Sequence, residues 1–168
     1  MAIQNGFIQI IQDEKRDYQH EEAMKTLRTN IQFSGNGLKV IMLTSAMTDE
    51  GKSETSFQLA ISMAQTEGRV LFIDADIRKS VLVSRFGGGQ QIYGLTQSLT
   101  GQRPVGEVLY HTNLPNLDII FSGPMAPNPA ELLSEDAFSK LIAWARNEYD
   151  TIIIDTPPLG SVIDGAII

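Results

Sequence analysis

Residues 38–65 contain a strand pattern, a glycine and lysine loop and a helix pattern in direct succession. The strand pattern is the apolar run at 38–43, and the helix pattern covers 53–65. Between them, four residues have the spacing of a P-loop: Ala46, Gly51, Lys52 and Ser53. A chance match is the alternative, but a P-loop requires this strand and helix on either side of it. The segment therefore predicts a site for nucleotide phosphates.

The loop and the first turn of the helix offer phosphates main-chain N–H groups and the positive end of the helix dipole. Gly51 lets the backbone approach a phosphate, Lys52 supplies a positive charge, and Ser53 offers a hydroxyl to Mg²⁺. The predicted nucleotide-binding residues are Met47, Thr48, Asp49, Glu50, Gly51, Lys52, Ser53 and Glu54.

Composition excludes several other kinds of site. The 168 residues suit one domain, and the absence of cysteine excludes disulfides and thiolate chemistry. The two histidines, His20 and His111, are far apart in the sequence, which disfavours a histidine metal site. A net charge of −7 disfavours nucleic acid as a partner, because nonspecific binding depends on Lys and Arg. No apolar run approaches the ~18 residues of a spanning helix, and we expect a cytoplasmic chain without a signal segment.

Two further apolar runs, at 70–73 and 151–154, end in carboxylates. Asp74 and Asp76 follow the first run, and Asp155 follows the second. The carboxyl ends of parallel strands meet at the ligand-binding edge of an open sheet, so these groups should lie near the P-loop. Residues two apart in a strand face the same side, so Asp74 and Asp76 are expected to face one ligand. A role as cap or turn residue is the alternative for each aspartate.

A lysine, a hydroxyl and carboxylates around a phosphate tail predict Mg²⁺-dependent phosphoryl transfer. The predicted catalytic residues are Lys52, Asp74 and Asp76, of which one aspartate accepts the proton of the attacking hydroxyl or water. The predicted Mg²⁺ ligands are Ser53, Asp74 and Asp155, the last acting through water. Positioning and charge stabilisation are expected to dominate catalysis.

Strand and helix patterns alternate along the chain, which predicts an α/β fold. The expected architecture is a doubly wound, mostly parallel sheet with helices on both faces, as in P-loop NTPases. We divide the chain into an N-terminal arm, residues 1–17, and one domain, residues 18–168. Strands are expected at 38–43, 70–73, 117–121 and 151–155. Helices are expected at 18–33, 53–65, within 95–109, and as one or two helices at 130–149.

Two local patterns have two interpretations each. Residues 86–94 hold four glycines, and a flexible surface loop is favoured over a second phosphate loop because no strand precedes them. Glu22, Lys25 and Arg28 recur every three residues on the polar face of the helix at 18–33. Spacing alone favours a solvated face over a subunit contact.

Four separated segments share the pattern of one family. They are Thr44-Ser-Ala-Met-Thr-Asp-Glu-Gly-Lys-Ser53, Val70-Leu-Phe-Ile-Asp-Ala-Asp-Ile-Arg78, Gly123-Pro-Met-Ala-Pro-Asn-Pro-Ala-Glu-Leu-Leu133 and Ile152-Ile-Ile-Asp-Thr-Pro-Pro158. The third is the most specific, because general P-loop ATPases have no reason to carry it. On these residues, the chain resembles the bacterial tyrosine kinases, which are P-loop kinases of capsule and exopolysaccharide synthesis. The resemblance runs from about residue 18 to residue 168 and includes a helix similar to the family's oligomerisation helix.

The resemblance implies an ATP-dependent protein-tyrosine kinase that autophosphorylates on neighbouring subunits of a ring-like homo-oligomer. It implies regulation of polysaccharide synthesis and export, and activation by the cytoplasmic segment of a membrane protein. That partner would recruit the kinase to the inner face of the membrane. Protein tyrosines are the implied substrates, and Glu22, Lys25 and Arg28 are the implied subunit contact.

The chain departs from the family pattern at several positions. Thr48 replaces a loop proline, Glu54 replaces a second hydroxyl, and Lys25 replaces an arginine whose bidentate pairing lysine cannot reproduce. The family continues beyond the segment that matches residues 160–168 and ends in a tyrosine-rich tail. The resemblance therefore implies a domain that is incomplete at its C-terminus, and an unusual chain is the alternative. The four tyrosines of this chain are instead scattered: Tyr18, Tyr93, Tyr110 and Tyr149.

Two other functions fit part of the pattern. A partition or division-site ATPase switch shares the fold, but its signature lysine would stand at the position of Met47. A nucleotide-binding scaffold without catalysis is the other alternative, and Glu54 would be one cause of its inactivity. The segment that ends at Leu133 favours the kinase.

Overall fold

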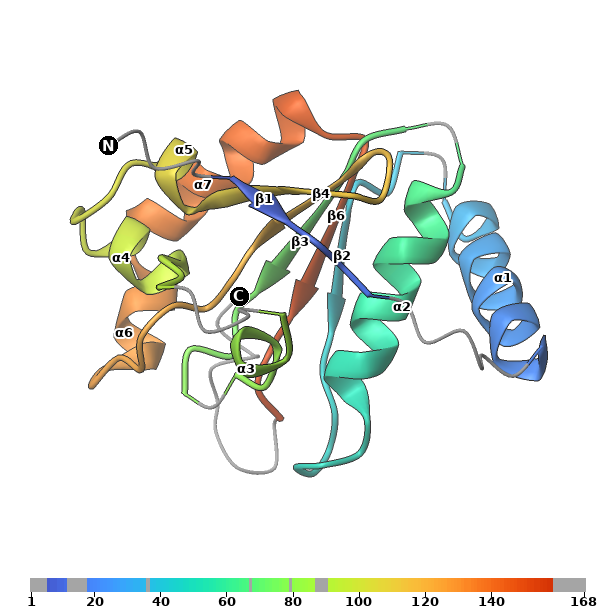
Figure 1. The fold of residues 1–168 in the computed structure, drawn as a ribbon, viewed down its shortest axis with the longest axis horizontal. Helices are drawn as coiled ribbons and strands as arrows, with labels where there is room; N and C mark the ends of the chain where they lie inside the picture. Colours follow the sequence, from blue (N-terminus) through green and yellow to red (C-terminus); the bar gives the residue numbers. More distant parts are fainter. Residues whose placement is uncertain are drawn as a thin grey trace.

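The computed structural model describes residues 6–11, 18–35, 37–66, 68–78, 80–86 and 91–158. Within them, a six-stranded sheet in the order β1-β4-β5-β3-β6-β2 lies between helices on both faces (Figure 1). The strands are β1 Phe7–Ile8, β2 Val40–Leu43, β3 Val70–Asp74, β4 Leu109–Thr112, β5 Leu117–Ile120 and β6 Thr151–Asp155. The predicted doubly wound, mostly parallel fold is confirmed, and β2, β3, β5 and β6 are the four predicted strands.

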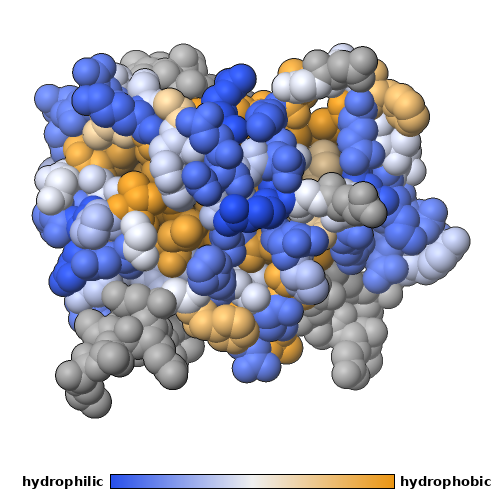
Figure 2. All heavy atoms as spheres, turned by 90° about the horizontal axis from the view of Figure 1, so that it is seen from above, coloured by the Kyte–Doolittle hydropathy of each residue, from blue (hydrophilic) through white to orange (hydrophobic). Residues whose placement is uncertain are grey.

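The helices also follow the sequence pattern. The predicted helix at 18–33 is present with those bounds, and the segment at 130–149 forms two helices. The helices are α1 Tyr18–Phe33, α2 Lys52–Ala64, α3 Leu82–Phe86, α4 Leu95–Leu99, α5 Val105–Val108, α6 Pro129–Ser134 and α7 Asp136–Glu148. None of the helices in the described part of the chain combines the length and hydropathy that crossing a bilayer requires. The end of the molecule at which the strands begin is largely hydrophilic, with hydrophobic patches between the polar side chains (Figure 2).

The register of the central strands brings the predicted site residues to one edge. Strand β6 pairs in parallel with both β2 and β3. Asp155 therefore lies opposite Leu43 on one side and opposite Asp74 on the other. The P-loop follows β2, so it begins at the same edge as both aspartates.

Strand β3 is apolar throughout because both of its faces are buried. Val70 and Phe72 pack in the core on the α2 side, while Leu71 and Ile73 pack in the core on the α7 side. Successive residues of a strand point to opposite faces, so a continuous apolar run serves two cores. The same arrangement explains the apolar run of β6.

Two strands of the sheet were missed by the sequence prediction. Strand β4 begins at Leu109, where α5 and the segment predicted to contain short helices both end, and it pairs antiparallel with β5. Strand β1 pairs in parallel with β4, and Ile8 and Ile10 of the predicted N-terminal arm are buried in the core. Both strands are short, and their pairing depends on neighbours far along the chain rather than on local propensity.

The interpretation of residues 86–94 as a flexible surface loop is wrong at Gly94, which is buried. Gly87, Gly88 and Gly89 lie outside the described residues, but Gly94 is buried where α4 meets the segment after β5. The amide N–H of Leu95 donates to the carbonyl of Phe121 at 2.7 Å. A Cβ atom on Gly94 would lie 2.3 Å from the amide nitrogen of Gly123 and 2.4 Å from the carbonyl oxygen of Phe121. Glycine is required here for close approach of two backbones.

We predict that Gly94→Ala lowers the free energy of unfolding by at least ~2 kcal/mol, because the methyl group would overlap rigid backbone atoms. Gly106→Ala is the matched control, since nothing lies within 4 Å of its added Cβ. Gly106 is in α5, so its replacement should be neutral or stabilise by up to about 1 kcal/mol. Urea unfolding of both variants measures the difference, and equal stabilities would contradict the close packing at Gly94.

Candidate active site

The P-loop turns sharply from β2 into α2. Gly51 precedes α2 with φ 79°, a left-handed conformation that glycine adopts without strain. Asp49 is also left-handed, with φ 60°. The loop is braced by its own polar side chains: the Met47 amide donates to Glu50 Oε2 at 3.1 Å, and Ser45 Oγ donates to the Met47 carbonyl at 2.8 Å. The amino end of α2 consequently faces the cavity that the loop encloses.

Lys52 and Asp155 form a buried ion pair behind this loop. Lys52 Nζ lies 2.5 Å from Asp155 Oδ1, and the two side chains are 8% and 1% exposed. Ser56, one helical turn after Lys52, donates from Oγ to the same Asp155 oxygen at 2.9 Å. Lys52 Nζ also lies 3.2 Å from Ser53 Oγ. The predicted lysine, hydroxyl and strand-end carboxylate are therefore in direct contact.

Asp74 lies beside this pair at the end of β3 and is 1% exposed. Its Oδ1 accepts the Asp76 amide N–H at 3.2 Å, and its Oδ2 accepts the Ser80 hydroxyl. Burial raises the pKa of Asp74 to about 7, and the negative charges of Asp155 and Asp76 act in the same direction. The hydrogen bond from Ser80 opposes the shift. A nearby cation would therefore stabilise the ionised form of Asp74.

Asp76 has a different environment from Asp74. Strand β3 ends at Asp74, so Asp76 lies beyond the strand, half-buried in the cavity wall. The expectation that both aspartates face one side because they are two residues apart in a strand therefore does not hold, since only Asp74 is in the strand. The two aspartates nevertheless remain neighbours, because the Asp76 amide is bonded to the Asp74 carboxylate.

A cavity of about 470 Å³ opens between the P-loop, α3 and the segment after β6. All eight predicted nucleotide-binding residues line it, together with Asp76. The sequence did not assign the other lining residues to the site: Ser45, Arg78, Val81, Leu82, Arg85, Pro157 and Pro158. Arg78, Pro157 and Pro158 belong to the segments that resemble the family pattern, whereas α3 gave no signal in the sequence.

Glu54 lies at the position where the family has a hydroxyl. Its Oε1 accepts a hydrogen bond from Gln58 Nε2 at 2.7 Å, and its Oε2 forms an ion pair with Arg85 Nη1 of α3. The carboxylate is therefore neutralised across the cavity by a cation of the opposite wall. This pairing reduces the repulsion that the Glu54 carboxylate would exert on bound phosphates.

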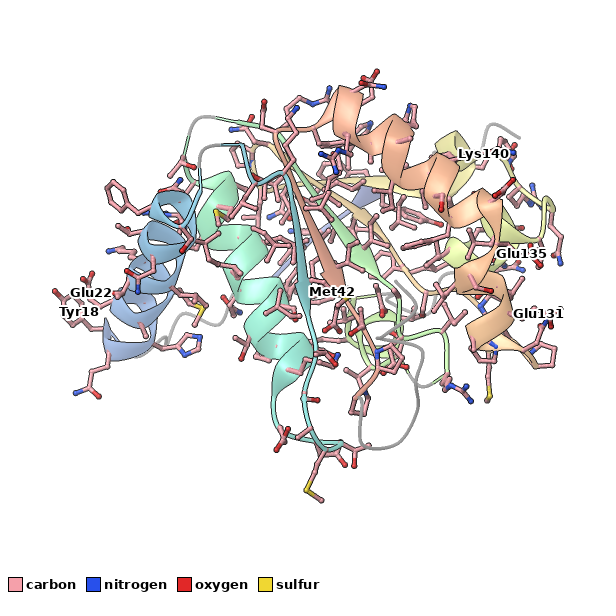
Figure 3. All side chains as sticks on the ribbon, turned by 180° about the vertical axis from the view of Figure 1, so that it is seen from behind. Tyr18, Glu22, Met42, Glu131, Glu135 and Lys140 are labelled. Carbon is pink, nitrogen blue, oxygen red and sulfur yellow. The ribbon has the colours of Figure 1, made fainter. Side chains whose placement is uncertain are left out.

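The residues predicted at a subunit contact point in different directions. Glu22 and Lys25 form an exposed ion pair of 2.8 Å on the outer face of α1, where Figure 3 labels Glu22. Arg28 instead donates from Nη1 to the Ser62 carbonyl of α2 at 2.6 Å. Arg28 thus holds α1 on α2, while the role of the three residues between subunits stays a prediction.

The arrangement suits Mg²⁺ bound together with phosphates. Among the residues that the structure describes, no group of three or more His, Cys, Asp and Glu could hold a metal ion. Mg²⁺ commonly takes one or two carboxylates and completes its shell with water and phosphate oxygens. Ser53, Asp155 and the buried Asp74 supply such oxygen atoms beside the P-loop.

Comparison with known proteins gives a family model, curated relatives and solved structures that match this chain. A family model described as "AAA domain" matches residues 38–168. Tyrosine-protein kinase CpsD of Streptococcus agalactiae is 47% identical over 148 residues, which cover 88% of this chain and 65% of that protein. The kinase domain of Escherichia coli tyrosine kinase ETK has a TM-score of 0.82 and 31% identity, covering 95% of this chain and 72% of that one.

A more distant structure shares the fold alone. The septum site-determining protein MinD of Pyrococcus horikoshii, complexed with Mg-ADP, has a TM-score of 0.60 and 21% identity over 72% of this chain and 49% of that one. The present chain spans about 65% of the length of the CpsD relatives and 20% of the Escherichia coli kinase etk.

We predict that Asp74→Asn stabilises the protein at pH 8 in the absence of nucleotide and metal. The folded protein binds the Asp74 proton more tightly than the unfolded chain does, because the pKa rises from 3.8 to about 7. The wild type therefore loses stability as the pH rises from about 4 to about 7, and asparagine does not. The gain at pH 8 should be roughly 1 to 4 kcal/mol.

Urea unfolding in EDTA at pH 4.5, 6 and 8 measures this difference. Asparagine can still accept the Asp76 amide and can donate to Ser80, so the hydrogen bonds are retained. A difference between variant and wild type that stays constant with pH would show that Asp74 titrates normally.

Proposed function

Because this chain belongs to the bacterial tyrosine kinase family of P-loop proteins, we propose that it transfers the γ-phosphoryl group of ATP to protein tyrosines. The observation that carries the proposal is the contact of Lys52 with Ser53 and Asp155 at the edge of a cavity lined by the whole P-loop. The kinase ETK matches this chain far more closely than MinD does, which favours the kinase over an ATPase switch. The proposed process is regulation of capsular and extracellular polysaccharide synthesis and export.

Each predicted residue has a separate task in this proposal. The P-loop amides and Lys52 bind and orient the phosphate tail, and Lys52 neutralises the charge that develops on it. Ser53, Asp155 and Asp74 would hold Mg²⁺, and the bound ion would supply positive charge that neutralises the phosphates. Asp76 lies in the cavity wall, where it can orient the tyrosine hydroxyl and accept its proton.

The proposal extends to partners and location. A ring-like homo-oligomer that uses Glu22, Lys25 and Arg28 is supported by the similarity of α1 to the family's oligomerisation helix. The cytoplasmic segment of a membrane protein is the proposed activator, which would recruit a cytoplasmic kinase to the inner face of the membrane. Nucleic acid is not a proposed partner, because the net charge of the chain is −7.

We predict that Lys52→Met lowers phosphotyrosine formation on a glutamate–tyrosine copolymer by at least ~100-fold, because it removes the cation that stabilises the transferring phosphate. Lys140→Met is the matched control. Lys140 is an exposed lysine of α7, labelled at the upper right of Figure 3, and it does not line the cavity, so its loss should leave the rate unchanged. The measurement is phosphotyrosine formation with Mg²⁺ and ATP.

The structure also predicts that Lys52→Met lowers the stability of the protein, which the sequence alone did not indicate. Within the described part of the chain, Lys52→Met leaves the buried Asp155 carboxylate with the Ser56 hydroxyl as its one remaining side-chain partner, and breaking such a pair commonly costs about 3 to 5 kcal/mol. Ser53→Ala is therefore a second test, because within the described part of the chain the Ser53 hydroxyl forms a hydrogen bond with the Lys52 ammonium alone. A folded Ser53→Ala protein that transfers phosphate at the wild-type rate would overturn the assignment of the Mg²⁺ ligand.

A further inference from the structure

We infer that Tyr18 is a phosphorylation site of this chain, and that a second copy of the chain phosphorylates it. This inference rests on the proposed kinase function and adds an acceptor to it. The chain holds four tyrosines, all of which fall within the described residues. They can therefore be compared directly as acceptors.

Three of the tyrosines are held inside the fold. Tyr149 is 2% exposed, and its hydroxyl donates to Asp118 Oδ2 at 2.6 Å. Tyr110 is 7% exposed, and its hydroxyl accepts the Tyr93 amide at 3.0 Å. Tyr93 is half-buried, with the Arg103 guanidinium 4.2 Å from the centre of its ring. Phosphorylation of these rings would require the core or its edge to open.

Tyr18 differs from the others in exposure and in backbone context. It is 73% exposed, and its side chain extends away from the molecule at the outer end of α1 (Figure 3). It is the first residue of α1, and the first four N–H groups of a helix have no partner within the helix. No residue of α1 is buried. Fraying the first turn therefore breaks few contacts, and Tyr18 can extend into a cavity without unfolding the domain.

The acceptor and the nucleotide cavity of one copy are on different sides of α2. Helix α1 packs on the outer side of α2, away from the sheet (Figure 1). The described residues that line the cavity fall between Ser45 and Pro158, and none of them comes from α1. Tyr18 therefore reaches the cavity of a second copy more readily than its own. The proposed subunit contact also lies on α1, which brings this helix to a neighbouring copy.

The step is an in-line phosphoryl transfer. The Tyr18 phenolic oxygen forms a bond to the γ-phosphorus of ATP bound by the second copy, and the bond from that phosphorus to the β,γ-bridging oxygen breaks. ADP leaves, and the phenolic proton passes to the Asp76 carboxylate of the second copy or to solvent. ATP is the only co-reactant that the step requires.

The modification changes the charge of a specific surface. Phosphate on Tyr18 would stand four residues before Glu22, which pairs with Lys25. Like charges at this spacing repel each other on a helix, so the phosphate would compete for Lys25. Phosphorylation of Tyr18 would therefore act directly on the polar face proposed for self-association.

The test incubates the chain with Mg²⁺ and ATP, with a glutamate–tyrosine copolymer in the same tube, and maps phosphotyrosine by mass spectrometry. We expect phosphate on Tyr18, and at least fivefold less phosphate on the chain in Tyr18→Phe. Tyr93→Phe is the matched control, expected to be labelled as the wild type is. All three proteins should phosphorylate the copolymer equally, which shows that the variants are folded. The initial rate of Tyr18 labelling per chain should rise with protein concentration, because two copies must meet.

The outcomes separate this inference from the proposed function. Phosphorylated copolymer with phosphate only on Tyr93, Tyr110 or Tyr149, or with none on the chain, would overturn the assignment of Tyr18. A labelling rate per chain that is independent of concentration would overturn transfer between copies. Absence of phosphate on both the copolymer and the chain would overturn the kinase function and, with it, this inference.

Discussion

The buried contact between Lys52 and Asp155 organises the site. It joins the first residue of α2 to the last residue of β6, and so it fixes the P-loop over the carboxyl edge of the sheet. Ser56 from α2 and the parallel register with β3 hold Asp155 in place from two further directions. A charge pair in so buried a place is not needed for stability alone, because apolar residues of similar volume commonly serve as well. Its value lies in keeping a lysine and a carboxylate beside the phosphate site.

Asp74 also lowers the stability of the fold while it places a charge at the site. A buried carboxyl group next to Asp155 and Asp76 disfavours its own ionisation, as the raised pKa shows. The fold retains this carboxyl group at the end of a central strand, where an apolar or amide side chain would lower the free energy of unfolding less. Such a cost is expected where a site is preorganised for a cation and a polyphosphate. The rigid sheet thus positions the charged side chains of the site. The exposed helix α1 carries the contacts proposed between copies.

The edge that carries the site could be predicted from the sequence, because strand ends and the P-loop are local patterns. Asp155 and Asp74 end apolar runs, and parallel strands leave only one edge for them to share. Ser56 and Ser80 could not be predicted, since their hydroxyls matter only through contacts formed on folding. Ser56 did carry a weak signal, one helical turn after Lys52.

The missed parts of the fold have similar causes. Strands β4 and β1 are short, and only their pairing to distant neighbours makes them strands. The predicted loop role of Gly94 is wrong because its actual role depends on the backbone of Gly123, which lies far along the chain. Composition and periodicity describe local preference, and these features are set by tertiary contact.

Hydrogen–deuterium exchange with and without Mg²⁺ and ATP tests the placement of the nucleotide most directly. Binding at the carboxyl edge predicts slower exchange of the amides in the P-loop, residues 45–53, and in the segments after β3 and β6. The amides of α1 should exchange at unchanged rates at protein concentrations where copies do not associate. Unchanged exchange in the P-loop, with protection at the amino ends of the strands instead, would contradict a nucleotide site built on Lys52 and Asp155.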